Sequence, residues 1–424
     1  MPSSAKKTTL KNGFRILTVP QSNTKAATVL VLVGTGSKYE TKKMSGISHF
    51  LEHMFFKGTS RRPSPVELQE LIDNVGGINN AFTSEELTGY FAKVDAKHTD
   101  LALDWVADIY QHSLLPAKEI AKEKGVVVEE INMYEDTPMR HVGDLWQNLL
   151  YGDQPAGWNI AGTKKTVSGL SRRDLVSYVN SQYVPSNTIL CVAGNIDGDA
   201  VIRRARKLFG PLADKKSQGK LLVKERQQKP NVFLKYRKTG QTHIALGVRA
   251  YNLSSEHRYA QDLIATMLGG MMSSRLFVAI REKLGGAYYI LTESEQNTDT
   301  GWVVSQSGLQ LAKAEQAIRA ILREYKSLAI KLVSEKELQK AKEHEIGTRI
   351  LRLESSEEQA EFYGVQELLE RRLLTPEQEY AKIRAVTPEN IRDLAKDIFR
   401  PENLNLVVLG PFKNKAKFEK LLRL

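Results

Sequence analysis

One segment of this chain occurs twice, at an offset of 216 residues in a protein of 424 residues. The first copy spans 170–195 and the second lies near the C-terminus, at 387–410. Each copy contains the pattern of a capped helix, a turn with proline, an apolar strand and a glycine. The offset aligns Pro185 with Pro401, Asn187 with Asn403, and Gly194 with Gly410. Three aligned pairs with one offset predict two similarly folded halves.

The segment between the halves, Asp214 to Pro230, is polar, basic and weakly periodic, as is typical of an exposed linker. We therefore place one domain at 1–213, a linker at 214–229 and a second domain at 230–424. Strands are expected at 14–19, 27–33, 87–94 and 188–193, and helices at 65–75, 97–111 and 172–182. Because strands and helices mix without strict alternation, the pattern favours the α+β class. We expect two similar tandem domains, each an antiparallel-rich sheet with helices packed on one face.

The first half also contains the pentapeptide His49-Phe50-Leu51-Glu52-His53, which the second half lacks. Residues four apart on a helix share a face, so both imidazoles can reach one metal ion. Glu52 can then serve as a general base, and this order, HxxEH, is that of the inverzincin peptidases. Ser45 or Ser48 is the expected helix cap. The alternative is a solvated helix face on which the three side chains bind no metal.

A hydrolytic zinc site usually has three protein ligands and a water molecule. Cys191 lies in an apolar run and is expected to be a core thiol, and the other histidines are scattered. A carboxylate is therefore the expected third ligand. A predicted helix at 119–135 places Glu123 and Glu130 two turns apart on one face, whereas Glu129 points elsewhere. The spacing leaves open whether this acidic pair approaches the histidine helix or forms a charged solvent-facing surface.

Together, the two stretches resemble peptidase family M16, the group of mitochondrial processing peptidase and pitrilysin, and look closest to its half-length bacterial members. The segment from Glu123 to Ile131 resembles the E-x6-E pattern of the family, whose last glutamate is the third zinc ligand. The resemblance implies that one zinc ion per chain is bound by His49, His53 and Glu130. It also implies that Glu52 is the general base and that Glu123 is an acidic residue supporting catalysis near the site.

Two further stretches resemble substrate-binding segments of the same family. The glycine-rich run 268–277 leads to Arg281 and Tyr288, a pair that in the family hydrogen-bonds the substrate backbone. Met271 and Gly286 depart from the residues that are frequent there. The segment 76–83 resembles the edge strand to which an extended substrate adds, so Asn80 and Ala81 are predicted contacts. The structural alternatives are a helix cap with a core tyrosine, and an ordinary hairpin strand.

The net charge of +12 arises partly from lysines between 215 and 229 and between 413 and 417. A nucleic-acid-binding protein is therefore an alternative, but no RNA or DNA motif accompanies these lysines, and we expect them to be solvated. No apolar run approaches ~18 residues, no secretory signal is visible, and a single cysteine fits a reducing compartment. We expect a cytoplasmic protein with neither a nucleic-acid nor a membrane partner.

The expected function is that of a zinc endopeptidase cleaving peptides or unfolded segments. Full-length relatives enclose the peptide with four such domains, so the resemblance implies that two chains form the chamber. We expect a homodimer in which Arg281 and Tyr288 act on the zinc site of the other chain, with a heterodimer of related chains as the alternative. A non-catalytic subunit of a larger complex is a further alternative. Such subunits commonly lose the HxxEH residues, which are intact here.

Overall fold

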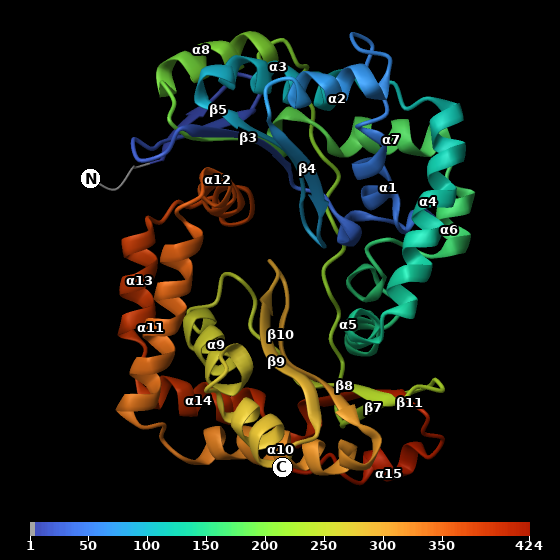
Figure 1. Ribbon diagram of the computed structural model, residues 1–424, viewed down its shortest axis with the longest axis vertical. Helices are drawn as coiled ribbons and strands as arrows, with labels where there is room; N and C mark the ends of the chain where they lie inside the picture. Colours follow the sequence, from blue (N-terminus) through green and yellow to red (C-terminus); the bar gives the residue numbers. More distant parts are fainter. Residues whose placement is uncertain (1–4) are drawn as a thin grey trace. The chain divides into compact units, whose positions relative to one another are not determined.

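The computed structural model describes residues 5–424, which form two compact units (Figure 1). Unit 1 contains the described residues up to Ile131, together with Asn159–Leu221 and Ile350–Thr375. Unit 2 contains Asn132–Trp158, Leu222–Arg349 and Pro376–Leu424. Each unit is built on one sheet covered by helices, so the predicted α+β class with two similar domains is confirmed.

The sheet of unit 1 has six strands in the order β1-β2-β6-β3-β5-β4. Their bounds are β1 (Lys6–Thr9), β2 (Arg15–Pro20), β3 (Ala26–Val33), β4 (Ile78–Thr83), β5 (Thr88–Asp95) and β6 (Thr188–Gly194). Only β2 and β6 pair in parallel, and all the other neighbours are antiparallel. Four of these strands, β2, β3, β5 and β6, are those that the apolar runs predict.

Helices cover both faces of this sheet, so the expectation that helices pack on one face alone is wrong. Val29, Val31 and Val33 of β3 pack in the core that includes α1 (Ile47–Met54), α3 (Thr99–His112) and α8 (Gly198–Phe209). Leu30 and Leu32 point to the other face, against α12 (Ser356–Val365), which Figure 1 shows across the sheet from α3 and α8. Because both faces are buried, β3 is apolar apart from Thr28 instead of alternating with polar residues.

The sheet of unit 2 has five strands in the order β7-β11-β8-β10-β9. Their bounds are β7 (Asn231–Tyr236), β8 (Gln241–Ala250), β9 (Ala287–Gln296), β10 (Gly301–Gln310) and β11 (Leu404–Gly410). One face packs on α9 (Arg258–Ala265), α10 (Ala314–Ile330) and α14 (Pro388–Ile398). The other face packs on α5 (Pro138–Tyr151) (Figure 1). Trp146 of α5 meets Trp302 of β10 edge to face.

The 216-residue offset extends over more of the chain than the repeated segment alone. It relates β6 to β11 and α7 (Arg172–Gln182) to α14 residue for residue, and α4 (Ala117–Asp136) to α11 (Glu335–Arg352) nearly so. Each unit also receives one helix from the other half of the sequence. Helix α5 from the first half packs in unit 2, and α12 from the second half packs in unit 1. A sheet that is apolar on both faces needs a second cover, and these helices supply it.

The remaining elements are shorter or peripheral. They are α2 (Pro65–Asp73), α6 (Lys164–Gly169), α13 (Pro376–Ala385), α15 (Lys415–Glu419) and the π-helical turns Thr266–Gly270, Phe277–Lys283 and Gln366–Glu370, besides short 3-10 turns. Residues 214–230 form neither helix nor strand. The expectation of solvated lysines is wrong at Lys220, because its ammonium group lies 2.7 Å from the buried Glu86 carboxylate. None of the helices in 5–424 is both long and apolar enough to span a bilayer.

Candidate metal centre

The helix that carries the HxxEH residues begins in an unusual way. Its N-cap is Gly46, with a φ of 95° and no side-chain capping bond. A Cβ at this position would lie 2.6 Å from the carbonyl oxygen of Ala161, so the turn requires glycine. The expected capping by Ser45 or Ser48 is therefore wrong. The Ser48 hydroxyl instead hydrogen-bonds the Tyr178 hydroxyl at 2.9 Å.

The buried carboxylate of Glu40 takes the place of a capping side chain. It accepts the N–H of Gly46 at 2.7 Å and the N–H of Ser48 at 2.9 Å. These are donors that the first turn of a helix leaves unsatisfied. Burial raises the pKa of Glu40 to about 8, although the two backbone donors oppose that rise. Sequence reasoning missed Glu40, because no local pattern links an acid upstream of a turn to the helix beyond it.

Three predicted ligands converge between α1 and α4. Nε2 of His49 lies 3.5 Å from Oε2 of Glu130, and Nε2 of His53 lies 3.4 Å from the same oxygen. A possible ligand atom of each residue lies within 4.8 Å of the others. Tetrahedral zinc with bonds of ~2.0–2.1 Å holds its ligand atoms about 3.3 Å apart. The donor types and their spacing therefore fit one zinc ion.

The structure separates the two glutamates that spacing left equivalent. Glu123 is buried and stands behind His53, with Oε1 accepting from Nδ1 of His53 at 2.9 Å. Its Oε2 lies 2.7 Å from the ammonium group of Lys57. Burial would raise the pKa of Glu123, but the hydrogen bonds and charges of His53 and Lys57 hold it below its usual range. Glu130 thus lies among the candidate ligands, whereas Glu123 orients one of them, as outer-shell carboxylates do.

The two imidazoles have different surroundings. Burial lowers the pKa of His53, but Glu123 and Glu130 together outweigh it and raise the pKa to about 9. The Nδ1 atom of His49 is buried and has no hydrogen-bond partner within residues 5–424. Only His53 therefore has a carboxylate that fixes its ring orientation. Sequence reasoning missed Lys57, although it lies four residues after His53 and its ammonium group pairs with Glu123.

Glu52 points to a different neighbour from the histidines. Its Oε2 accepts a hydrogen bond of 2.6 Å from the hydroxyl of Thr83, the last residue of β4. Helix α1 thus directs its histidines toward α4 and Glu52 toward β4. The general base predicted from the sequence lies beside the sheet edge, and Thr83 is a neighbour that sequence reasoning missed.

Asn80 and Ala81 lie on that edge strand. Within residues 5–424, β4 pairs with β5 alone, so one side of β4 has no strand neighbour. Asn80 is exposed, and its side-chain oxygen accepts the N–H of Ala81 at 2.9 Å. An unpaired strand edge can accept an extended peptide through main-chain hydrogen bonds. The substrate contacts of both residues stay a prediction.

Arg281 and Tyr288 belong to unit 2 and are both exposed. Arg281 lies in the π-helical turn Phe277–Lys283, and Tyr288 lies in the edge strand β9. The guanidinium group donates to the backbone carbonyl of Tyr288 at 3.4 Å and lies 5.1 Å from the ring centre of Phe277. Arg281 thus lies beside the backbone of Tyr288, and the contact of both residues with substrate stays a prediction.

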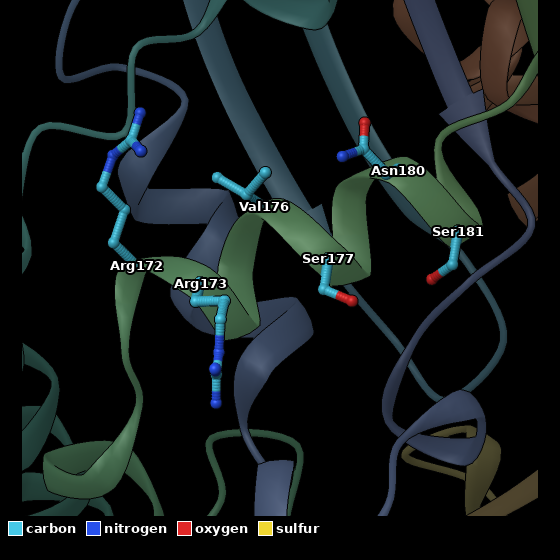
Figure 2. A pocket seen from close by; sticks show the side chains of 6 residues that line it. All are labelled: Arg172, Arg173, Val176, Ser177, Asn180 and Ser181. Carbon is cyan, nitrogen blue, oxygen red and sulfur yellow. The ribbon is translucent and has the colours of Figure 1, made fainter.

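One depression on unit 1 lies along α7 (Figure 2). It is lined by Arg172, Arg173, Val176, Ser177, Asn180 and Ser181. Arg172 is already engaged, since it donates to the carbonyls of Leu114 and Leu115. None of the predicted site residues lines this depression, so it adds nothing to the metal centre.

Comparison with known proteins agrees with the geometry. Residues 15–164 match the family described as insulinase (peptidase family M16), and residues 169–344 match the peptidase M16 inactive domain. This chain belongs to peptidase family M16. The lack of HxxEH in the second M16 domain fits the description of that domain. At the 216-residue offset, Gln339 and Ile346 stand where α4 has Glu123 and Glu130.

The M16 relatives are similar over nearly their whole length. A protein of Bacillus subtilis named uncharacterized zinc protease is 36% identical and covers 96% of this chain and 99% of its own length. A Streptomyces coelicolor protein named in the same way is 33% identical, over 97% of this chain and 91% of its own. The structure of a Helicobacter pylori protease superimposes with a TM-score of 0.89 at 24% identity, over 97% of this chain and 100% of that one. That last likeness supports the M16 fold.

Proposed function

We propose that this chain is a zinc-dependent endopeptidase of the inverzincin type. The observation that carries the proposal is the convergence of His49, His53 and Glu130, in which each histidine Nε2 lies 3.4–3.5 Å from Oε2 of Glu130, with Glu52 on the same helix as the histidines. Three protein ligands leave a fourth position for water or substrate, which distinguishes catalytic from structural zinc sites. The zinc protease names of the relatives support the same metal.

Each residue then has a defined task. Zinc, when bound, supplies Lewis acidity that polarises the scissile carbonyl and lowers the pKa of a water molecule. Glu52 accepts the proton of the attacking water and later donates it to the leaving amine. Glu123 holds the ring of His53 through Nδ1, which leaves Nε2 of that ring to face the ligand cluster. The HxxEH helix itself is held at its N-terminus by Glu40.

The open edge of β4 supports an extended peptide as the substrate. Strand addition needs a backbone whose N–H and C=O groups are unpaired, so peptides and unfolded segments suit it better than folded proteins. We further propose a homodimer in which Arg281 and Tyr288 of one chain act at the zinc site of its partner. Arg and Tyr side chains can donate hydrogen bonds to a carbonyl oxygen that gains charge in the tetrahedral intermediate.

The test is cleavage of a quenched, unstructured peptide by wild type and Glu52→Gln, each with chelator and after zinc is restored. We expect that only the wild type cleaves the peptide, that chelator abolishes this cleavage, and that added zinc restores it. Glu129→Gln is the matched control, because Glu129 is an exposed neighbour of Glu130 on the same helix and should retain activity. Cleavage by a clean Glu52→Gln preparation contradicts the assigned base. No cleavage by zinc-loaded wild type favours a non-catalytic subunit or a different partner chain.

The homodimer has its own test, in which two inactive variants are mixed. Glu52→Gln retains Arg281, and Arg281→Gln retains Glu52. If Arg281 acts across the dimer, a mixed dimer contains one site with both residues intact, and mixing restores activity. If Arg281 acts on the zinc site of its own chain, no mixed dimer has such a site and mixing restores nothing. Sedimentation of the wild type as an active monomer would also contradict the dimer.

A further inference from the structure

We propose that Thr83 is a positioning residue that fixes the orientation of the general base, an inference that rests on the proposed peptidase function. The Thr83 hydroxyl donates to Oε2 of Glu52 at 2.6 Å. No other hydrogen bond to the Glu52 carboxylate occurs within the described part of the chain. A single contact from β4 therefore determines how the carboxylate of α1 is turned.

The chemistry explains why one oxygen should be held. A general base must lie within about 2.6–3.2 Å of the proton that it abstracts, and the terminal torsion of a glutamate is broad. The hydroxyl of Thr83 holds Oε2, which leaves Oε1 to accept the proton from water. Without this donor the carboxylate samples orientations in which neither oxygen faces the water, and fewer enzyme molecules are ready to react.

Thr83 is itself placed by the sheet. It is the last residue of β4 and pairs with Thr88 of β5, whose hydroxyl donates to the carbonyl of Thr35 at 2.9 Å. A β-branched side chain has few χ1 rotamers, so the strand backbone sets the direction of the hydroxyl. The same strand carries Asn80 and Ala81, the predicted substrate contacts. The base is therefore oriented by the strand to which the peptide is expected to add.

Two pairs of variants separate the effect of the hydroxyl group on kcat from the effect of side-chain shape. Thr83→Val retains the branched shape without a donor, whereas Thr83→Ser retains the donor without the methyl group, and Thr83→Ala is the matched partner of Thr83→Ser. General-base catalysis contributes roughly 10²–10⁴-fold, so we expect misorientation to lower kcat by about 10–100-fold in Val and Ala. We expect Ser to stay within about threefold of wild type. The loss of kcat from Thr83 to Val should agree with the loss from Ser to Ala at the same position. If one variant fails to fold, the other comparison still tests the hydroxyl group.

Three measurements separate positioning from a structural role. KM should stay within about twofold in Thr83→Val, because the donor contacts the base and not the peptide. Zinc affinity, measured by chelator competition, should equal that of wild type. The affinity of an uncleaved fluorescent peptide should be the same for Glu52→Gln and for the double variant Glu52→Gln/Thr83→Val.

The outcomes distinguish this inference from the proposed function. Cleavage by wild type, none by Glu52→Gln, and wild-type kcat in Thr83→Val would overturn the role of Thr83 alone. A Thr83→Ser variant as slow as Thr83→Ala, or a loss of zinc in Thr83→Val, would assign Thr83 a structural role and overturn the inference as well. Absence of cleavage by zinc-loaded wild type overturns the proposed peptidase function, and the inference about Thr83 with it.

Discussion

Replacing Glu123 with Met should weaken zinc binding, and by an amount that depends on pH. The side chain of Glu123 is buried, so the unbranched Met fills a similar volume while it removes the acceptor for Nδ1 of His53. Loss of an outer-shell partner of a metal-bound histidine typically costs 10–100-fold in metal affinity. That corresponds to about 1.4–2.7 kcal/mol.

Competition between protons and zinc for His53 offsets part of this loss of affinity. The pKa of His53 in the metal-free protein is raised to about 9, so zinc must displace a proton at neutral pH. In wild type this competition weakens as the pH rises from 7 towards the pKa of His53, and it disappears above that pKa. The raised pKa stabilises the protonated ring, so zinc affinity rises with pH up to about 9. Glu123→Met removes one of the two carboxylates that raise this pKa, and so reduces the competition.

We therefore expect the full 10–100-fold loss of affinity at pH 9 and a smaller loss at pH 7. The assay is competition for zinc with a chromophoric chelator at both pH values, with metal content checked by mass spectrometry. Glu129→Met is the control, because it alters an exposed glutamate of the same helix and should match wild type. Zinc affinity equal to wild type at pH 9 would refute the assigned role of Glu123.

Three further predictions concern the scaffold and are tested by thermal unfolding. Gly46→Ala should lower Tm and reduce zinc content, because its positive φ and the nearby backbone leave no space for a Cβ. Glu86→Gln should lower the free energy of unfolding by about 3–5 kcal/mol. Lys220→Met should lower it clearly less, because Lys38 still pairs with Glu86 when Lys220 is removed. Equal losses in the two variants would contradict this. Because Lys38 and Lys220 outweigh burial and lower the pKa of Glu86, its stabilisation is present above its unfolded pKa and is lost as pH falls through the folded pKa. Trp146→Ala should lower the free energy of unfolding by about 3–5 kcal/mol. An unchanged Tm would refute the role of α5 as the helix that buries the second face of the unit 2 sheet.

The repeated elements were predictable because their signals are local. Strands β6 and β11 have continuous apolar runs bounded by proline turns and glycine, and α7 and α14 begin with capping boxes. The exchange of α5 and α12 was not predictable in this way. An apolar face on a helix shows that the helix is buried, but it does not show which sheet buries it.

The same distinction holds at the metal centre. Spacing placed His49 and His53 on one helix face and Glu123 and Glu130 on one face of another. It could not establish that the two helices meet, which the resemblance to the M16 family and then the structure supplied. Glu40 and Thr83 act through contacts with residues distant in sequence or beyond a turn, so no periodicity marks them.

The most direct test of the account is the position of zinc in crystals of the inactive variant Glu52→Gln, located by anomalous scattering at the zinc edge. We expect one strong peak per chain at about 2.0–2.2 Å from Nε2 of His49, Nε2 of His53 and a carboxylate oxygen of Glu130. Glu123 should remain outside the coordination sphere and bonded to Nδ1 of His53. A zinc-loaded protein with no peak at these three residues, or with Glu123 in place of Glu130, would contradict the account.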